Sequence, residues 1–412
     1  MKVINSLLNH FKTNASEKTN VKVAYILSFL SELYFPIVAW LFFYLRYLDF
    51  KQIAVITAIH VITSNLFEIP TGAFADLFGR RKAIFLSFFV CSFVMFAYPF
   101  NSVFWMFVVL EVIGGITNAL LSGSLEALVY DTLKEAKEEQ RFNKVVANMQ
   151  SLSWIGLFIS AIAGGFVYKF WFGTPWILQG IVFGIAAIFS LKLHEPKVDT
   201  QKYQLKMLLT QNLVGFRELF KNKKIAQTTI IFMIIGAGYF VASKILGISQ
   251  AREYGMDSSK VGLLFATGYI ISALASQIFP KLIGWLGSKK LLITAVAILI
   301  GSFVFAKFSG IAIGSILIIS RISSSTTFWN IESSILNPLI ESKNRATSLS
   351  TFALLTQLPY ALLAYTIGDT IDKSSPNHLA LILGLTIIVL LGIQQLVFYL
   401  LKIKVVTAID KG

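Results

Sequence analysis

The chain has 412 residues, and 56% of them are hydrophobic even before glycine is counted, whereas only 14% are charged. Soluble domains have roughly 45–50% apolar and roughly 25% charged residues, so this composition excludes a soluble globular protein and predicts a chain embedded in a lipid bilayer. The net charge of +15 does not predict a nucleic-acid partner, because the lysines and arginines are spread between apolar runs instead of gathering on one domain.

Twelve apolar runs predict twelve transmembrane helices, since one membrane span needs about 20 mostly apolar residues. In chain order they cover residues 23–45, 52–75, 83–100, 102–128, 143–169, 174–192, 226–249, 257–280, 290–308, 310–336, 346–370 and 377–401. The longest polar stretch separates the sixth run from the seventh. The predicted fold class is therefore an all-α membrane protein with an N-terminal six-helix bundle (1–192), a cytoplasmic linker (193–225) and a C-terminal six-helix bundle (226–412).

The basic residues predict the orientation of the chain in the membrane. If the N-terminus is cytoplasmic, 27 of the 36 lysines and arginines fall in cytoplasmic segments and 7 in outer segments, while Lys244 and Arg321 lie inside helices. Because the cytoplasmic loops of membrane proteins carry an excess of basic residues, this distribution predicts that both termini are cytoplasmic. The expected location is the inner (plasma) membrane of a cell, which the chain crosses many times.

A basic turn follows the second predicted helix, where residues 72–82 read GAFADLFGRRK. A weaker echo, GWLGSKK at 284–290, follows the eighth helix, as expected for a chain built from two related halves. The first segment resembles the hallmark loop of the major facilitator superfamily, and its surroundings resemble a prokaryotic branch with many presumed exporters. The resemblance implies two pseudo-symmetric six-helix bundles that open a central site to each side of the membrane in turn.

In that superfamily, the loop forms a charge cluster that holds the cytoplasmic side closed when the outside is open. The resemblance assigns this gate role to positions in the loop and at the end of the fourth helix, namely Gly72, Asp76, Gly79, Arg80, Arg81, Glu126 and Asp131. The alternative is that the loop is only a basic turn on the cytoplasmic side.

The fifth predicted helix carries a set of small residues, namely Gly156, Ser160, Ala161, Gly164 and Gly165. Their spacing resembles the antiporter motif of the superfamily, with Ser160-Ala161 in place of its usual Gly-Pro. Close packing of this helix on its neighbours explains the same residues without any role in coupling.

Charged side chains inside the predicted helices are functional candidates, because a charge near the bilayer centre costs about 3 kcal/mol or more unless it is paired or hydrated. Glu32 lies near the middle of the first helix, and Tyr25 shares one face with it. We interpret that face as the lining of a substrate cavity, with a structural hydrogen bond to a neighbouring helix as the alternative. Lys244 in the seventh helix either extends toward the outer surface or neutralises Glu32. His60 in the second helix is more typical of a helix–helix hydrogen bond than of a proton relay.

Two counterpart helices carry polar stripes. The fourth helix has Glu111, Asn118 and Glu126 at spacings that place them on one side. The tenth helix repeats the pattern with Arg321, Phe328 and Glu332. Since these helices line the central cavity in the superfamily, Glu111 and Arg321 are predicted to pair across it, with a static interhelical salt bridge as the alternative.

These features predict secondary active transport by alternating access, and the first hypothesis is proton-coupled export of a small organic or amphipathic compound. Proton coupling needs a carboxylate whose protonation competes with substrate binding, and Glu32 and Glu111 are the candidates. Uptake of a nutrient or metabolite, by a symporter or a facilitator, is the alternative, and lipid transport and a sensor role stay open. The predicted partners are a small-molecule substrate, protons and the lipid bilayer, with no nucleic acid, and the predicted state is a monomer.

Enzymatic activity is not predicted, because no constellation of nucleophile and base or of metal ligands stands out in the sequence. The single cysteine, Cys91, excludes a cysteine-based metal site, and neither a metal nor a cofactor is expected. The sequence lacks the phosphate-binding pattern Gly-x-x-x-x-Gly-Lys-Ser/Thr, which argues against transport driven by ATP.

Overall fold

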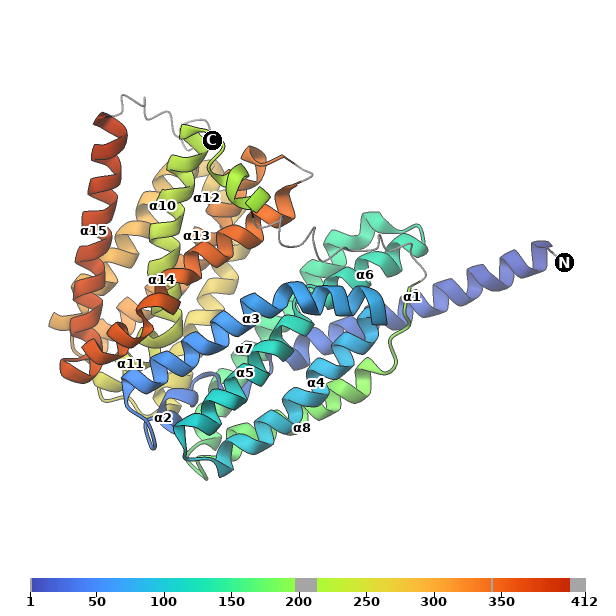
Figure 1. Ribbon diagram of the computed structural model, residues 1–412, viewed down its shortest axis with the longest axis horizontal. Helices are drawn as coiled ribbons and strands as arrows, with labels where there is room; N and C mark the ends of the chain where they lie inside the picture. The colour runs from blue at the N-terminus through green and yellow to red at the C-terminus, as the bar shows by residue number, and fades with distance from the viewer. Residues whose placement is uncertain (1, 197–212, 342–343, 401–412) are drawn as a thin grey trace. The chain divides into compact units, whose positions relative to one another are not determined.

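The computed structural model describes residues 2–196, 213–341 and 344–400, in which the regular structure is helical throughout. The first part contains α1 (Lys2–Glu32), η1 (Phe35–Ile37), α2 (Trp40–Tyr44), α3 (Phe50–Phe78), α4 (Arg80–Ala97), η2 (Tyr98–Phe100), α5 (Phe104–Leu121), α6 (Ser124–Glu135), η3 (Glu139–Arg141), α7 (Phe142–Val167) and α8 (Thr174–Ser190). The second part contains α10 (Lys223–Val241), η4 (Ala242–Leu246), α11 (Gly247–Glu253), α12 (Ser258–Val304), η5 (Ala306–Phe308), α13 (Ile311–Leu336), η6 (Asn337–Leu339), α14 (Arg345–Lys373) and α15 (Pro376–Leu400). Figure 1 colours them from blue to red along the chain. The predicted all-α fold class is confirmed.

Eight helical segments of the described residues are long and apolar enough to cross a membrane. One of them, α12, covers two predicted spans, 257–280 and 290–308, which are joined by a bend at Gly287 with a φ of 74°. The helices α1, α8 and α14 coincide with three further predicted spans. The observed helices are therefore consistent with twelve crossings.

The first predicted span is not one continuous helix. α1 ends at Glu32, and the turn η1, which contains Pro36, leads into α2. Proline lacks the N–H that a helix needs and disfavours helical backbone at the residue before it, so the predicted helix over 23–45 is wrong in its middle. The N–H of Phe35 in this break donates to Oε1 of Gln179 on α8 at 2.9 Å, which compensates for the lost helical bond.

Two other spans also depart from the expected continuous helix. In the fourth span, Gly123 adopts a left-handed φ of 69° and separates α5 from α6. In the seventh span, η4 is a π-helical segment between α10 and α11. Such segments are often found at functional sites, and this one contains Lys244.

The chain forms two compact units. Unit 1 comprises Met1–Phe43 and Ile59–Leu205, and unit 2 comprises Tyr44–Ala58 and Lys206–Gly412. Within unit 1, α4 packs on α5 and α8, and α1 packs on α7; within unit 2, α12 packs on α13, and α10 packs on α14 and α15. Residues 44–58, which the predicted N-terminal bundle includes, count with unit 2. The N–H groups of Phe50 and Lys51 at the start of α3 donate hydrogen bonds to Asp372 on α14.

The contact between α1 and α7 depends on small residues. A Cβ atom added at Gly156 would lie 2.8 Å from the carbonyl oxygen of Phe29, and one added at Gly164 would lie 2.0 Å from that of Phe35. Ser160, which lies between the two glycines, is fully buried. The small residues of the fifth predicted span thus let α7 approach the broken first span at backbone distance.

Candidate functional site

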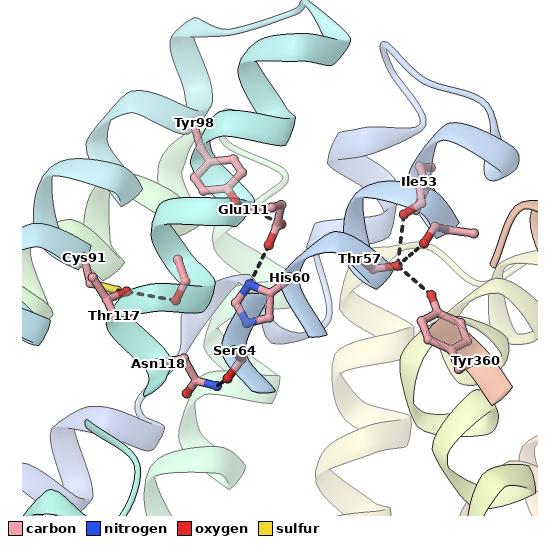
Figure 2. Close-up of polar contacts among 12 residues, drawn as sticks. Ile53, Thr57, His60, Ser64, Cys91, Tyr98, Glu111, Thr117, Asn118 and Tyr360 are labelled. Atoms are coloured by element: carbon pink, nitrogen blue, oxygen red, sulfur yellow. Dashed lines mark hydrogen bonds and ion pairs between the residues drawn. The ribbon is translucent and has the colours of Figure 1, made fainter. Parts of the chain in front are cut away.

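A histidine and a glutamate meet inside unit 1. His60 on α3 and Glu111 on α5 place Nδ1 and Oε2 2.7 Å apart, and the hydroxyl of Tyr98 donates to the other carboxylate oxygen, Oε1, at 3.0 Å. Figure 2 shows His60 and Glu111 pointing toward each other between their helices. The side chain of His60 is 30% exposed and that of Glu111 is 13% exposed, so the pair is mostly buried.

Glycines on α5 make this meeting possible. A Cβ atom at Gly115 would lie 2.9 Å from the carbonyl oxygen of His60 and 2.9 Å from Cβ of Thr63, so only glycine lets the two helix backbones come this close. At Gly114, a Cβ atom would lie 3.5 Å from the imidazole of His60, which is an ordinary contact. Gly115 therefore sets the distance between α3 and α5 at which the pair forms.

The arrangement brings two ionisable side chains into contact inside predicted membrane spans. Because an imidazole nitrogen and a carboxylate oxygen can each carry a proton, the contact forms a hydrogen bond between α3 and α5 whichever group holds it.

Other polar contacts surround this pair in unit 1. Asn118 donates to the hydroxyl of Ser64 at 3.0 Å, one turn of α3 beyond His60. The thiol of Cys91 and the hydroxyl of Thr117 are 2.9 Å apart, in a contact that also appears in Figure 2. The predicted stripe of the fourth span is interrupted, because the break at Gly123 lies between Asn118 and Glu126 on α6.

The first-span candidates lie at the contact with α7. Glu32 is the last residue of α1 and is half-buried, and its backbone oxygen accepts from Ser160 at 3.4 Å. The hydroxyl of Tyr25 accepts from the side-chain amide of Asn148 at 3.1 Å. The structure thus places Tyr25 and Glu32 on the side of α1 that meets α7, and the hydrogen bonds described here do not join either of them to Glu111.

Two candidates of the second half, Arg321 and Phe328, are buried in unit 2. Arg321 is 3% exposed, donates to Oε1 of Gln250 at 2.8 Å and lies over the ring of Phe303 at 5.2 Å. Phe328 is fully buried and packs against the rings of Phe232, Tyr239 and Trp329 in the core of unit 2.

Two further charged residues belong to this half. Lys244 is half-buried, and its ammonium lies 5.4 Å from the centre of the Phe240 ring. Glu332 is 7% exposed, and its Oε1 has no hydrogen-bond partner among the described residues. The contacts described here join Glu111 and Arg321 to residues of their own units, and none of these residues is the partner predicted from the sequence.

Three of the residues that the resemblance assigns to a gate, Asp76, Arg80 and Asp131, form a charge cluster in unit 1. Nη1 of Arg80 lies 2.5 Å from Oδ2 of Asp131. Nη2 of Arg80 lies 3.9 Å from Oδ1 of Asp76. A cavity of about 290 Å³ borders these three side chains. Glu126, by contrast, is exposed on the first turn of α6, and a Cβ atom at Gly72 would meet no other atom within 4 Å.

The turn that carries Arg80 is capped by a residue beyond the sixth span. Gly79 has a φ of 100° and precedes α4, whose first two N–H groups, those of Arg80 and Arg81, donate to the carboxylate of Glu195 at 2.7 and 2.9 Å. The side chain of Arg81 donates to the carbonyl oxygen of Leu191 at 2.7 Å.

A third polar cluster joins the start of α3 to the end of α14 within unit 2. The N–H groups of Phe50 and Lys51 donate to the two carboxylate oxygens of Asp372 at 3.0 and 2.9 Å. Further along α3, the hydroxyls of Thr57 and Tyr360 are 2.5 Å apart, as Figure 2 shows. The carboxylate of Asp372 therefore accepts from N–H groups that the start of α3 leaves without a partner inside the helix.

Comparison with known protein families identifies the family of this chain. The sequence profile of the Major Facilitator Superfamily matches residues 23–364. The chain belongs to the major facilitator superfamily. Among curated members, it is 25% identical to the MFS-type transporter YxaM of Bacillus subtilis (strain 168) over 232 residues, which cover 53% of this chain and 55% of that protein.

Two other curated relatives match the chain at similar identity. The MFS-type transporter MJ1560 of Methanocaldococcus jannaschii is 24% identical over 74% of this chain and 73% of its own length. Multidrug resistance protein 2 of Bacillus subtilis (strain 168) is 21% identical over 56% of this chain and 57% of its own length. The chain thus matches little more than half of the length of YxaM and of the multidrug resistance protein.

Solved structures of superfamily members share the fold. The nucleoside transporter NupG superposes with a TM-score of 0.76 at 14% identity, covering 93% of this chain and 99% of that one. A POT family transporter in complex with 5-aminolevulinic acid superposes with a TM-score of 0.70 at 13% identity, covering 92% and 95%. The chain is a multi-pass membrane protein of this superfamily.

Sequence reasoning about this superfamily member missed three features of the site. The contact of His60 with Glu111 was not predicted, although the adjacent Gly114-Gly115 signals a close helix contact at that depth. Glu195 was assigned to the linker, and no short motif marks it as a cap. Asp372 accepts from the first turn of α3, and nothing in its own sequence neighbourhood points to that helix.

Proposed function

We propose that this transporter exports small amphipathic organic compounds in exchange for protons, by alternating access. The observation that carries the proposal is the contact of His60 with Glu111 at 2.7 Å inside predicted membrane spans. The name of one relative, Multidrug resistance protein 2, supports export and an organic substrate.

The chemistry of the pair supports exchange in particular. A buried charge within a membrane costs about 3 kcal/mol or more unless a partner neutralises it. The deprotonated pair carries a negative charge that either a proton or a cationic substrate can neutralise, so the two compete for the same site. Competition of this kind couples the exit of a cation to the entry of a proton, which favours amphipathic cations as substrates.

The proposal also has a topological part. The chain acts as a monomer in the inner membrane. Both of its termini lie in the cytoplasm, as the distribution of lysines and arginines predicts. Gate closure by Arg80 and Asp131 then occurs on the cytoplasmic side, and Asp372 lies on the outer side.

The test uses purified protein in liposomes that contain a pH-sensitive dye and carry an imposed pH gradient. The panel contains an amphipathic cationic dye, a neutral drug, a nucleoside and an amino acid. We expect the cation to drive proton movement, and we expect this movement to be lost in Glu111→Gln and reduced at least about tenfold in His60→Gln. Glu32→Gln tests the rival carboxylate, and Glu126→Gln is the control for an exposed carboxylate.

Each outcome decides between functions. Proton movement that persists in Glu111→Gln but is lost in Glu32→Gln moves the coupling site to the first span. Cation transport without proton movement in the unmodified protein contradicts proton exchange. Transport of the nucleoside or amino acid in the same direction as protons makes the protein an uptake symporter and contradicts export.

A further inference from the structure

The residues that follow α8 form a short strap, residues 191–195, across the ends of three other helices of unit 1. Its buried anchor is Leu193, which is 1% exposed. Its neighbour His194 exchanges two hydrogen bonds with the buried side chain of Asn20 on α1: the N–H of His194 donates to Oδ1, and Nδ2 donates to its carbonyl oxygen, both at 2.8 Å. Asn20 also donates to the hydroxyl of Thr132 on α6 at 2.8 Å, so the strap is tied to α1 and α6.

The last residue of the strap occupies the start of α4. The N–H groups in the first turn of a helix have no partner within the helix, and Gly79 has no side chain to supply one. The carboxylate of Glu195 accepts from the N–H groups of Arg80 and Arg81 at 2.7 and 2.9 Å. A carboxylate at this end also interacts favourably with the positive end of the helix dipole.

The glycine of the turn makes room for this carboxylate. A Cβ atom at Gly79 would lie 2.9 Å from Oε2 of Glu195, and the φ of 100° already disfavours any other residue. The turn and the strap therefore fit each other, and the strap is positioned independently through Leu193 and Asn20.

We propose that Glu195 is a positioning residue of the cytoplasmic gate. It fixes the backbone of Arg80, from which the guanidinium reaches Asp131 at 2.5 Å and Asp76 at 3.9 Å. The proposal rests on the alternating access of the proposed function, because a gate is needed only if the cytoplasmic side opens and closes. It adds to the gate a residue outside the loop motif.

The experiment measures how often the cytoplasmic side is open. A reporter cysteine replaces the exposed Ser122 in a Cys91→Ser background, and a membrane-impermeant maleimide is added on the cytoplasmic side of membrane vesicles. Glu195→Ala is expected to raise the labelling rate about threefold to tenfold, as loss of a helix cap weakens the closed gate. Glu195→Gln, which keeps one acceptor oxygen, is expected to give a smaller increase, and the exposed Glu139→Ala is the matched control.

A double substitution separates positioning from general stability. If Glu195 acts through Arg80 on Asp131, then Glu195→Ala changes the labelling rate little in an Asp131→Asn background. An equal increase in both backgrounds, or no increase in the single variant with unchanged melting temperature, would overturn the proposal. The assay needs no substrate and no proton gradient, so its failure is distinct from failure of the proposed exchange function.

Discussion

Gly79 and Gly72 belong to the same short motif, residues 72–82, yet their surroundings differ. Gly79 has a left-handed φ of 100° and lies against the carboxylate of Glu195. Gly72 lies within α3, and a Cβ atom there would meet no other atom within 4 Å. The resemblance to a family motif assigns both glycines to the gate, but only the first is required by the local geometry.

Substitution of the two glycines by alanine should therefore have different effects. Gly79→Ala is expected to destabilise the protein by about 1–3 kcal/mol, because it combines a strained backbone with displacement of Glu195. Gly72→Ala is expected to be neutral or slightly stabilising, since alanine favours a helix interior. Melting temperatures of the detergent-solubilised variants check this, and an equal loss in both would contradict it.

Between helices, α3 and α5 approach each other at a point set by one glycine of a pair. Gly115 faces the backbone of α3 at a distance that leaves no room for a methyl group, whereas Gly114 faces the imidazole of His60 with ordinary spacing. The contact of His60 with Glu111 is thus a property of the helix pair as well as of the two side chains.

Alanine at these two glycines should distinguish the helix contact from the side chains. Gly115→Ala is expected to separate α3 from α5 and to reduce substrate-driven proton movement by about tenfold or more, because a misplacement of about 1 Å in a site costs that much or more. Gly114→Ala is expected to retain most of that activity. The liposome assay measures both, and loss of activity in Gly114→Ala alone would contradict the role given to the helix contact.

The start of α3 offers a second test at this scale. Asp372→Ala is expected to speed hydrogen–deuterium exchange in a peptide that contains Phe50 and Lys51, because their N–H groups lose the acceptor. Asp369→Ala is the matched control, since its contacts are to the side chains of Lys51 and Lys373 and exposed ion pairs contribute little. Unchanged exchange in Asp372→Ala, or equal changes in both variants, would refute the cap.

Prediction of the elements from the sequence succeeded where apolar runs were long and failed where a helix is interrupted. Every predicted span overlaps observed helix, because hydrophobic length alone identifies a crossing. The breaks after Glu32 and at Gly123, and the π-helical turn around Lys244, were not predicted. Single glycines and prolines occur in many unbroken membrane helices, so their consequence depends on which neighbour satisfies the freed backbone groups.

At the level of the whole molecule, family and fold were predicted from one loop and the six-plus-six pattern, but the contacts of the site were not. Periodicity placed Glu111 on a polar stripe, and the observed partner of its carboxylate is His60. The spacing of residues along a helix indicates which of them share a face. The rotation of each helix about its own axis, which decides the neighbour that this face meets, depends on packing at positions such as Gly115. The role of Glu195 depends on a contact between residues more than 100 positions apart.

The predicted orientation gives a direct test for the complete chain. In a Cys91→Ser background, Lys134→Cys at the end of α6 is expected to react with an impermeant maleimide only from the cytoplasmic side. Lys373→Cys at the end of α14 is expected to react only from the outside. Reaction of both cysteines from one side would exclude the proposed topology.

One helix, α3, is shared by the two compact units: its residues up to Ala58 count with unit 2, and those from Ile59 onward count with unit 1. If the units move as separate bodies, α3 has to bend at this division or release Asp372 from its first turn. His60 follows directly after Ile59, and Glu111 also belongs to unit 1, so a bend at the division leaves the contact of the imidazole with Glu111 inside one unit.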